Sequence, residues 1–190
     1  MSIDQWNERY RSGEQLFETP SPLVVRFAGN LAPGRALDLA CGPGRNSLFL
    51  AEKGWQVTAV DGSPLAIATL EKRAGDRRLR VDTQVADLER GKLAIPAGAF
   101  DLIMDCYYLQ RDLLPQIKAG VRPRGLAIVI VHLANADQPH GTPTRARPGE
   151  LRSFFSDWKI LHDYEGEPGE SCHKHSVAEV VAKKPSGGRQ

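Results

Sequence analysis

Four acidic or glycine positions in the first third of the chain have the spacing of a nucleoside-binding half-site. Asp38 lies in an apolar, strand-like run, and the turn Gly42-Pro43-Gly44 follows it directly. A second apolar run, 56–60, ends on Asp61. Glycines let a backbone approach a ligand closely, and the start of the following helix supplies unpaired N–H groups. Asp61 could accept hydrogen bonds from ribose hydroxyls, so the pattern indicates a site for a nucleoside.

Two classes of cofactor are compatible with this layout. Dinucleotide sites favour Gly-x-Gly-x-x-Gly, but Ser47 stands where the third glycine would be. Asp38 would also repel a pyrophosphate at short range, because both are negative. A carboxylate there suits a cationic ligand such as S-adenosylmethionine, which carries an ammonium and a sulfonium. An NAD-dependent oxidoreductase remains the first alternative, and a protein that binds an adenosyl cofactor without catalysis is the second.

The elements that must position these residues alternate along the chain. Strands are expected at 35–40, 56–60, 80–86, 100–106 and 126–132, with helices at 45–53, 64–73 and 112–119 between them, and two helices, within 1–19 and 23–31, precede them. Such alternation predicts a parallel sheet with right-handed crossovers. A helix at 147–155 and strands at 158–166 and 171–183 follow. Because only 167–170 joins the last two strands, they should form a hairpin, which reverses the final strand.

The ordered motifs resemble those of class I S-adenosylmethionine-dependent methyltransferases. The matching segments are 37–44, 60–64, 86–88, 100–105 and 122–126. The run Gly44-Arg45-Asn46-Ser47, together with Trp6-Asn7-Glu8-Arg9-Tyr10, is similar to the tellurite-resistance and thiopurine-methyltransferase-like branch. The resemblance implies an α/β fold: a Rossmann-like, seven-stranded, mostly parallel sheet with a reversed last strand and helices on both faces. It also implies S-adenosylmethionine as the cofactor.

The resemblance carries over to a set of candidate cofactor-binding residues. They are Trp6, Asp38, Ala40, Gly42, Gly44, Asn46, Asp61, Gly62, Ser63, Ala86, Asp87, Leu88 and Asp105. Segment 1–20 is expected to act as a lid in which Trp6 and Tyr10, four residues apart, share one helix face. Asp61 could instead cap the next helix, although Ser63 before Pro64 is the better cap. Asp87 could instead be an ordinary turn residue.

Candidates for acceptor binding and catalysis follow the fourth and fifth strands, because ligands of open α/β sheets bind beyond the carboxyl ends of strands. Methyl transfer needs alignment more than a dedicated catalytic group. The catalytic candidates are Tyr107, Arg111 and His132, and the substrate-binding candidates are Tyr108, Arg145 and Arg147. The two loop arginines could hold an anionic acceptor or could simply be solvated. Gln110 stands where the related branch often has a histidine, which removes one possible base.

The cysteines and the Cys172-His173-Lys174-His175 run suggest neither disulfides nor a metal. Three cysteines, Cys41, Cys106 and Cys172, are too few for a disulfide framework. Cys41 and Cys106, each at a strand end, could line the cofactor cleft or be small buried hydrophobes. On a strand His173 and His175 would share a face from which Cys172 points away, so an exposed edge strand is favoured and no metal is expected.

Bulk composition sets the outer limits. The 190 residues fit one domain, 1–190, whose residues 184–190 form a disordered tail. A net charge of +2 gives no strong field towards nucleic acid, and the basic run 72–80 has no interleaved aromatics. We expect no membrane span and no signal peptide, hence a cytoplasmic protein. The expected acceptor is a small molecule: a metalloid oxyanion, a thiol or another soft nucleophile.

Overall fold

The computed structural model describes residues 2–13, 17–89, 93–134, 140–170 and 173–186. They fall into two compact units, 1–93 and 94–190. The expectation of a single domain over 1–190 stays a prediction. The two units are described separately below.

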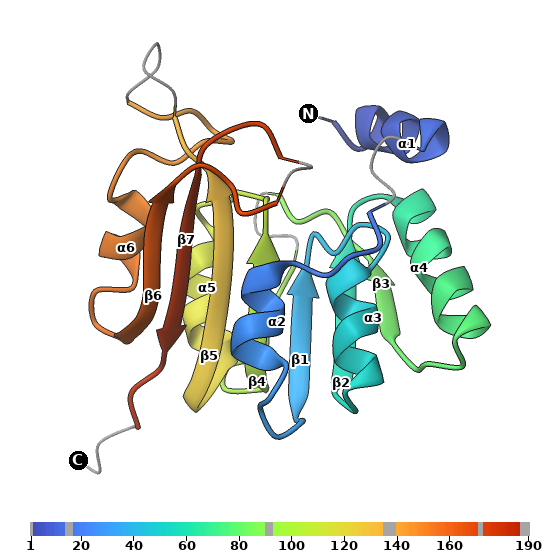
Figure 1. Ribbon diagram of the computed structural model, residues 1–190, viewed down its shortest axis with the longest axis horizontal. Coiled ribbons are helices and arrows are strands. Elements are labelled where there is room, and N and C mark those ends of the chain that lie inside the picture. Colours follow the sequence, from blue (N-terminus) through green and yellow to red (C-terminus); the bar gives the residue numbers. More distant parts are fainter. Residues whose placement is uncertain (1, 14–16, 90–92, 135–139, 171–172, 187–190) are drawn as a thin grey trace. The chain divides into compact units, whose positions relative to one another are not determined.

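The first unit contains four helices and three parallel strands among its described residues (Figure 1). In chain order they are α1 (Ile3–Ser12), α2 (Pro22–Ala28), β1 (Arg35–Leu39), α3 (Arg45–Glu52), β2 (Gln56–Asp61), α4 (Pro64–Asp76) and β3 (Asp82–Val85). Strand β2 pairs in parallel with β1 on one side and with β3 on the other. The carboxyl ends of β1 and β2 therefore meet at the same edge, as the nucleoside-site prediction requires.

Capping and burial explain why these segments form the first unit. The Ser63 hydroxyl accepts a hydrogen bond from the Ala66 N–H at 3.1 Å, and Pro64 takes the first helical position of α4. The inner faces of α3 and α4 meet strand β2 through Leu48, Leu70 and Ala59, which are almost completely buried. Apolar burial of this kind is the main source of stability for short helices.

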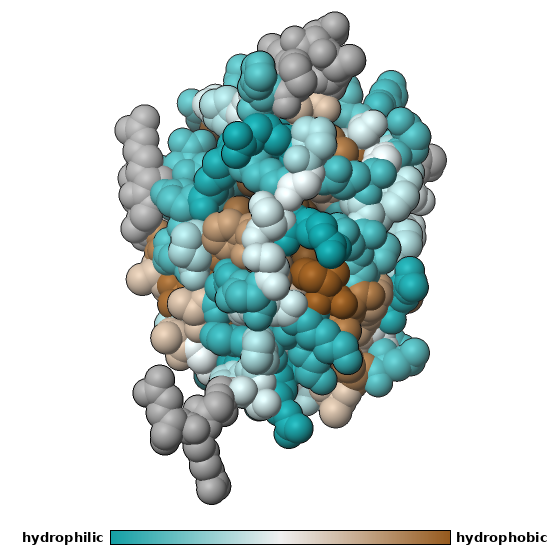
Figure 2. Space-filling model, turned by 90° about the vertical axis from the view of Figure 1, so that its left-hand side faces the viewer, coloured by the Kyte–Doolittle hydropathy of each residue, from teal (hydrophilic) through white to brown (hydrophobic). Residues whose placement is uncertain are grey.

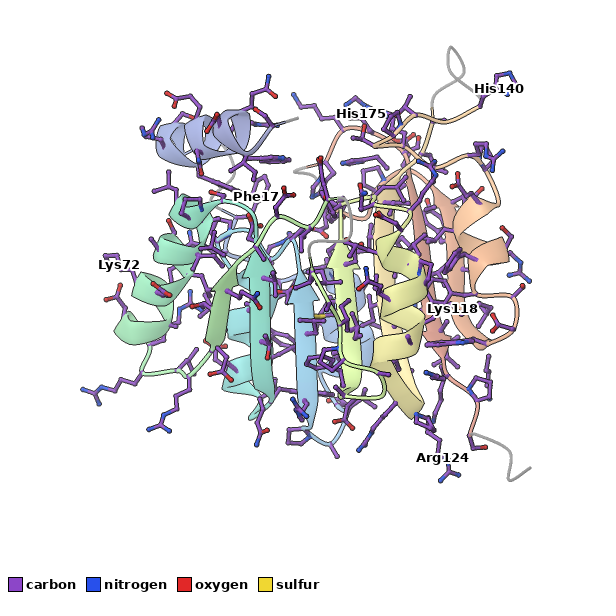
Figure 3. All side chains as sticks on the ribbon, turned by 180° about the vertical axis from the view of Figure 1, so that it is seen from behind. Phe17, Lys72, Lys118, Arg124, His140 and His175 are labelled. Atoms are coloured by element: carbon purple, nitrogen blue, oxygen red, sulfur yellow. The ribbon has the colours of Figure 1, made fainter. Side chains whose placement is uncertain are left out.

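The second unit contains four strands and two helices among its described residues. They are β4 (Phe100–Cys106), α5 (Leu113–Gly120), β5 (Val121–His132), α6 (Glu150–Phe154), β6 (Lys159–Gly166) and β7 (Val177–Lys183). Strands β4 and β5 are parallel, whereas β7 is antiparallel to both β5 and β6. Seen from behind, α5 covers β4 and β5 (Figure 3).

The strand order, β3-β2-β1-β4-β5-β7-β6, confirms the predicted seven-stranded, mostly parallel sheet with a reversed last strand. Two boundaries differ from the sequence-based expectation. Strand β5 begins at Val121, which pairs with Phe100; the register then shifts across 122–125, where Arg124 has φ 69°, before Leu126 pairs with Leu102. Strand β7 begins only at Val177, so the link after β6 is longer than the predicted 167–170.

The ends of the chain also differ from the expectation. Helix α1 stops at Ser12, because Gly13 adopts φ 82° and closes the helix with its N–H on the carbonyls of Arg9 and Tyr10. At the other end Lys184, predicted to start the tail, donates its main-chain N–H to the Gly125 carbonyl at 2.9 Å. Residues 187–190 lie outside the described part of the chain.

The surface over edge strand β6 is mixed in character. Figure 2 shows hydrophobic residues there as patches separated by hydrophilic ones. Leu161 and Tyr164 on β6 are exposed. Within the residues that the structure describes, no helix has both the length and the apolar composition to cross a lipid bilayer.

Candidate active site

The carboxylate of Asp61 organises the first candidate site. Asp61 ends strand β2 and is almost fully buried. Its Oδ2 accepts a hydrogen bond from the Gly42 N–H at 2.8 Å, and its Oδ1 accepts one from the Ser63 N–H at 2.8 Å. Burial raises the pKa of this carboxyl, and the two N–H groups oppose the shift. A carboxylate offers about four acceptor positions, so two remain for a ligand's hydroxyl groups.

The turn between β1 and α3 has a backbone conformation that favours glycine. Gly42 and Gly44 both adopt positive φ, 54° and 84°, which side chains rarely tolerate. A Cβ at Gly42 would lie 3.2 Å from the Tyr10 hydroxyl oxygen. Ala40 at the end of β1 also has a positive φ, 50°, although it is not a glycine. Such strain is often found at ligand sites.

A second buried carboxylate lies beside the turn. Asp38 on β1 is completely buried and accepts a hydrogen bond from the Ser47 hydroxyl at 2.6 Å. Burial raises the pKa of Asp38 to about 7; the Ser47 hydrogen bond and Arg45 lower it, and the negative charge of Asp61 adds to the rise. Asn46, one residue before Ser47, binds the Ser21 N–H through its Oδ1 at 2.9 Å. That contact ties the start of α2 to the start of α3.

Helix α1 packs over this turn within the first unit. The Ser63 hydroxyl donates a hydrogen bond to Oδ1 of Asn7, and a Cβ at Gly62 would lie 3.2 Å from Ile3 Cδ1. Trp6 stacks on Tyr10 with ring centroids 5.8 Å apart. Burial, followed by the negative charge of Asp61, raises the pKa of the Tyr10 hydroxyl, which therefore stays protonated at neutral pH. Figure 1 shows α1 beside the start of α4.

The third predicted motif lies at the end of β3. The Ala86 N–H donates to the Asp61 main-chain carbonyl at 3.0 Å, so this motif adjoins the end of β2. Asp87 accepts the Glu89 N–H through its Oδ1 at 2.9 Å, which is the turn geometry that the alternative interpretation predicted. Leu88 is buried. The cofactor-binding role of Asp87 and Leu88 stays a prediction.

The residues of the first unit fit an adenosyl cation better than a diphosphate. Asp38 and Asp61 are both buried, and the negative charge of Asp61 raises the pKa of Asp38 and of the Tyr10 hydroxyl. Two buried carboxylates stabilise a positively charged ligand and disfavour a pyrophosphate. The Gly42 and Gly44 backbone, Asp61 and the N-terminus of α3 are the groups that would hold S-adenosylmethionine.

The second unit holds a cluster of rings after strands β4 and β5. Tyr107 directly follows β4 with φ 69°, and its ring stacks on His173 at 3.5 Å between centroids. His132, the last residue of β5, lies 5.5 Å from the Tyr107 ring and 5.8 Å from the His175 ring. The Tyr107 hydroxyl donates to Glu170 Oε1 at 2.8 Å. We call these four rings, of Tyr107, His132, His173 and His175, the ring cluster.

The imidazole of His132 is held in its neutral form. Its pKa is lowered to about 4, first by burial and then by the positive charges of Arg145 and His175, whereas a backbone hydrogen bond with His175 opposes the shift. Its Nδ1 is buried and has no hydrogen-bond partner among the residues that the structure describes. In Figure 3, His175 lies at the end of the second unit opposite to Arg124.

The remaining predicted residues divide by what they contact. Asp105 on β4 is buried and Tyr108 is half-buried. Arg111 binds both oxygens of Glu150, through Nε at 2.6 Å and Nη2 at 3.1 Å. Arg145 is half-buried, and its Nη1 donates to the Leu133 carbonyl at 3.1 Å. Arg147 is exposed and contacts Glu150. Their roles in binding or catalysis stay predictions.

The sequence interpretation of the final histidines was wrong in one respect. His173 and His175 precede β7 rather than lying on it, because the strand begins at Val177. The His173 ring stacks on Tyr107, and the His175 ring lies edge-on to His132. Among the described residues, no group of three histidine, cysteine or acidic side chains could hold a metal ion. Cys172 lies outside those residues. Cys41 and Cys106 are half-buried free thiols, and burial raises the pKa of Cys41 well above its ordinary value.

Four contributors to the two sites were not found from the sequence: Asn7, Ser47, Glu150 and Glu170. Their partners are Ser63, Asp38, Arg111 and Tyr107, between 9 and 63 residues away along the chain. Only Ser47 had a local signal, since its hydroxyl lies in the first turn of the helix that follows the glycines.

Comparison with known proteins settles the family. The family model described as tellurite resistance protein TehB matches residues 6–180. The chain belongs to the TehB family. Among curated relatives of this TehB-family chain, hemagglutinin 1 of Eikenella corrodens is 31% identical over 137 residues, which is 69% of this chain and 46% of that protein. The probable S-adenosyl-L-methionine-dependent methyltransferase TehB of Haemophilus influenzae strain Rd is 29% identical over 161 residues, 80% of this chain and 54% of that protein.

A solved structure confirms the fold of this TehB-family chain. The crystal structure of TehB from Haemophilus influenzae superposes with a TM-score of 0.76 at 24% identity, over 94% of this chain and 67% of that one. The class I methyltransferase fold predicted from the motifs is therefore confirmed. The chain spans about half the length of the two curated relatives, 46% and 54%.

Proposed function

We propose that this chain is an S-adenosylmethionine-dependent methyltransferase that acts on a small-molecule acceptor. The observation that carries the proposal is the buried pair of carboxylates, Asp38 and Asp61, beside a turn in which Gly42 and Gly44 both have positive φ. Membership of the TehB family supports the same cofactor, as does the Haemophilus influenzae relative, a probable S-adenosyl-L-methionine-dependent methyltransferase. The cofactor, when bound, supplies an activated methyl group on a sulfonium.

The residues of the first unit bind and orient that cofactor. The two free acceptor positions on Asp61 suit ribose hydroxyls, and the α3 N-terminus suits the cofactor's carboxylate. The Tyr10 hydroxyl on α1 lies against Gly42 of the turn, and Trp6 stacks on Tyr10. We assign the lid role predicted for segment 1–20 to helix α1.

The acceptor binds to residues at the carboxyl ends of β4 and β5 in the second unit. The strained backbone of Tyr107 and the half-buried, neutral imidazole of His132 support this assignment. A neutral imidazole can accept a hydrogen bond from a methyl acceptor that carries an O–H, N–H or S–H group. Arg145 can attract a methyl acceptor that is negatively charged. Thiols, metalloid oxyanions and other soft nucleophiles are the classes to test.

Calorimetric titration with S-adenosylhomocysteine and, separately, NADH tests the cofactor assignment. We expect saturable binding of S-adenosylhomocysteine and much weaker binding of NADH. Preferential NADH binding would instead support the oxidoreductase alternative.

A radiolabelled methyl donor, offered with tellurite, selenite, small thiols and small amines, tests catalysis. We expect labelled product from at least one acceptor, with a rate that depends on enzyme concentration. Tight binding of S-adenosylhomocysteine without turnover of any acceptor would contradict the enzymatic proposal and favour a non-catalytic cofactor-binding protein.

A further inference from the structure

The guanidinium of Arg111 is saturated by contacts within the second unit. Two of its donors bind the Glu150 carboxylate, at 2.6 and 3.1 Å. The others bind main-chain carbonyls of Thr142 at 2.9 Å, Pro143 at 3.4 Å and Arg145 at 3.2 Å. A guanidinium has five N–H donors, so these five contacts use its full capacity. Arg111 therefore has no donor left for a substrate in this arrangement.

Glu150 connects the same contacts to helix α6. It is the first residue of α6, and its Oε2 also accepts the Arg147 N–H at 2.8 Å. The hydrogen bond from Arg111 lowers the pKa of Glu150, so the carboxylate is charged at neutral pH. Its side chain is only 16% exposed, which limits screening by solvent. One ion pair thus fixes both the loop and the start of the helix.

The loop held by Arg111 is joined to the end of β5. Thr142 and Arg145 exchange main-chain hydrogen bonds at 3.0 and 3.3 Å, forming a tight reversal. The next residue, Ala146, donates its N–H to the His132 carbonyl at 2.9 Å. A displacement of residues 142–146 would therefore be transmitted directly to the last residue of β5.

Arg145 is the side chain that this loop presents. Its Nη1 binds the Leu133 carbonyl at 3.1 Å, and its positive charge lowers the pKa of His132. Its remaining donors have no hydrogen bond to the residues that the structure describes. The loop therefore places the half-buried guanidinium of Arg145 near the neutral imidazole of His132.

We propose that Arg111 is a positioning residue: it fixes residues 142–150 so that Arg145 is held beside His132, where the two side chains bind the methyl acceptor. The acceptor part of this inference rests on the proposed function. The positioning part does not, because it concerns only contacts within the second unit. Arg111 itself does not touch the acceptor.

The pKa of His132 gives a readout that is independent of catalysis. The groups that face this imidazole are Arg145, His175 and the rings of Tyr107 and His173. In the wild-type protein NMR titration should place its pKa near 4. In Arg111→Ala the loop is released and Arg145 moves away, so the pKa should rise towards the ordinary value of 6.5. Arg145→Met should raise it in the same direction.

Arg152→Ala is the matched control. Arg152 forms a comparable ion pair with Asp163 in the same unit, and its side chain is similarly exposed, 59% against 40% for Arg111. It makes no hydrogen bond or ion pair with residues 142–147 among those that the structure describes. We expect the His132 pKa to be unchanged in this variant.

Kinetics supply the second readout, with whichever acceptor the methyl-donor screen identifies. Arg111→Ala should raise the acceptor KM about ten- to a hundredfold, as misplacement of a binding group does, with a smaller effect on kcat. The Kd for S-adenosylhomocysteine should not change. Arg111→Lys should not restore KM, because an ammonium cannot reproduce the five-donor fork.

The outcomes separate the two proposals. If the wild-type protein methylates no acceptor, the proposed function fails, and the NMR titration still decides whether Arg111 positions Arg145. An unchanged His132 pKa in a folded Arg111→Ala variant would overturn the positioning inference. An unchanged acceptor KM in an otherwise active Arg111→Ala enzyme would overturn the assignment of the acceptor site.

Discussion

Asp61 is the residue on which the contacts of the cofactor site converge. Its two carboxylate oxygens fix the amides of Gly42 and Ser63, which belong to the turns after β1 and β2. Its main-chain carbonyl binds Ala86 at the end of β3. One side chain therefore sets the mutual positions of the glycine turn and the next helix while retaining acceptor capacity for a ligand.

Asp61→Asn separates these roles. The amide keeps one acceptor oxygen but turns the other position into a donor that faces an N–H group. We expect S-adenosylhomocysteine to bind about ten- to a hundredfold more weakly, equivalent to about 1–3 kcal/mol, by calorimetry. Glu71→Gln, an exposed carboxylate on α4 that binds Thr83, is the control and should leave affinity unchanged. Wild-type affinity in folded Asp61→Asn would contradict the assignment.

The strand ends are the elements that carry the chemistry. Ala40 after β1 and Tyr107 after β4 both adopt left-handed backbone, with φ of 50° and 69°. A non-glycine residue in this region costs of the order of 1–3 kcal/mol, which the surrounding contacts must offset. Gly44, which also has a positive φ, is the residue that directly precedes α3 and completes the turn from β1 into this helix.

Gly44→Ala should destabilise the protein by about 2–4 kcal/mol. A Cβ there would lie 2.1 Å from Leu70 Cδ1, and Leu70 is completely buried and cannot move away. Gly75→Ala in α4 is the matched control, because nothing lies within 4 Å of its Cβ position and alanine favours a helix. Urea unfolding should show a loss for the first variant and no loss for the second. Equal stabilities would show that the turn adapts.

At the scale of the whole molecule, strands and helices that have a repeating local pattern could be predicted from the sequence. Contacts between residues far apart in the chain could not. The alternation of apolar runs with helices gave the strands around Asp38, Asp61 and Asp105 to within a few residues. The first part of β5 was missed because 122–125 has the composition of a turn, whereas its place in the strand depends on main-chain pairing with Phe100 and Lys184, which local composition does not encode. The contacts Arg111–Glu150 and Asn7–Ser63 join residues 39 and 56 positions apart, and no local spacing encodes them.

The buried carboxylate of Asp38 should make global stability depend on pH. Its pKa is raised to about 7 in the folded protein from 3.8, so the folded state binds more protons between these values. Its contribution is therefore most favourable below about pH 4 and is lost as the pH rises through about 7, by at most of the order of 4 kcal/mol. Asp38→Asn keeps an acceptor for Ser47 and removes the titration.

Urea unfolding of both proteins between pH 4 and pH 8 measures this effect. The stability of Asp38→Asn relative to the wild type should increase with pH across that interval. A difference that stays constant with pH would mean that Asp38 is already ionised in the folded state. Other titrating groups are common to both proteins and cancel in the comparison.

The position of β7 between β5 and β6 has a consequence for biosynthesis. Because translation is vectorial, β5 and β6 leave the ribosome before the strand that pairs with both of them. Until Val177–Lys183 emerges, each of these strands presents an open edge to other nascent chains. A frameshift or premature stop just ahead of this short segment would therefore leave β5 and β6 each with an unpaired edge that promotes aggregation. We expect chaperones and proteases to remove such a product.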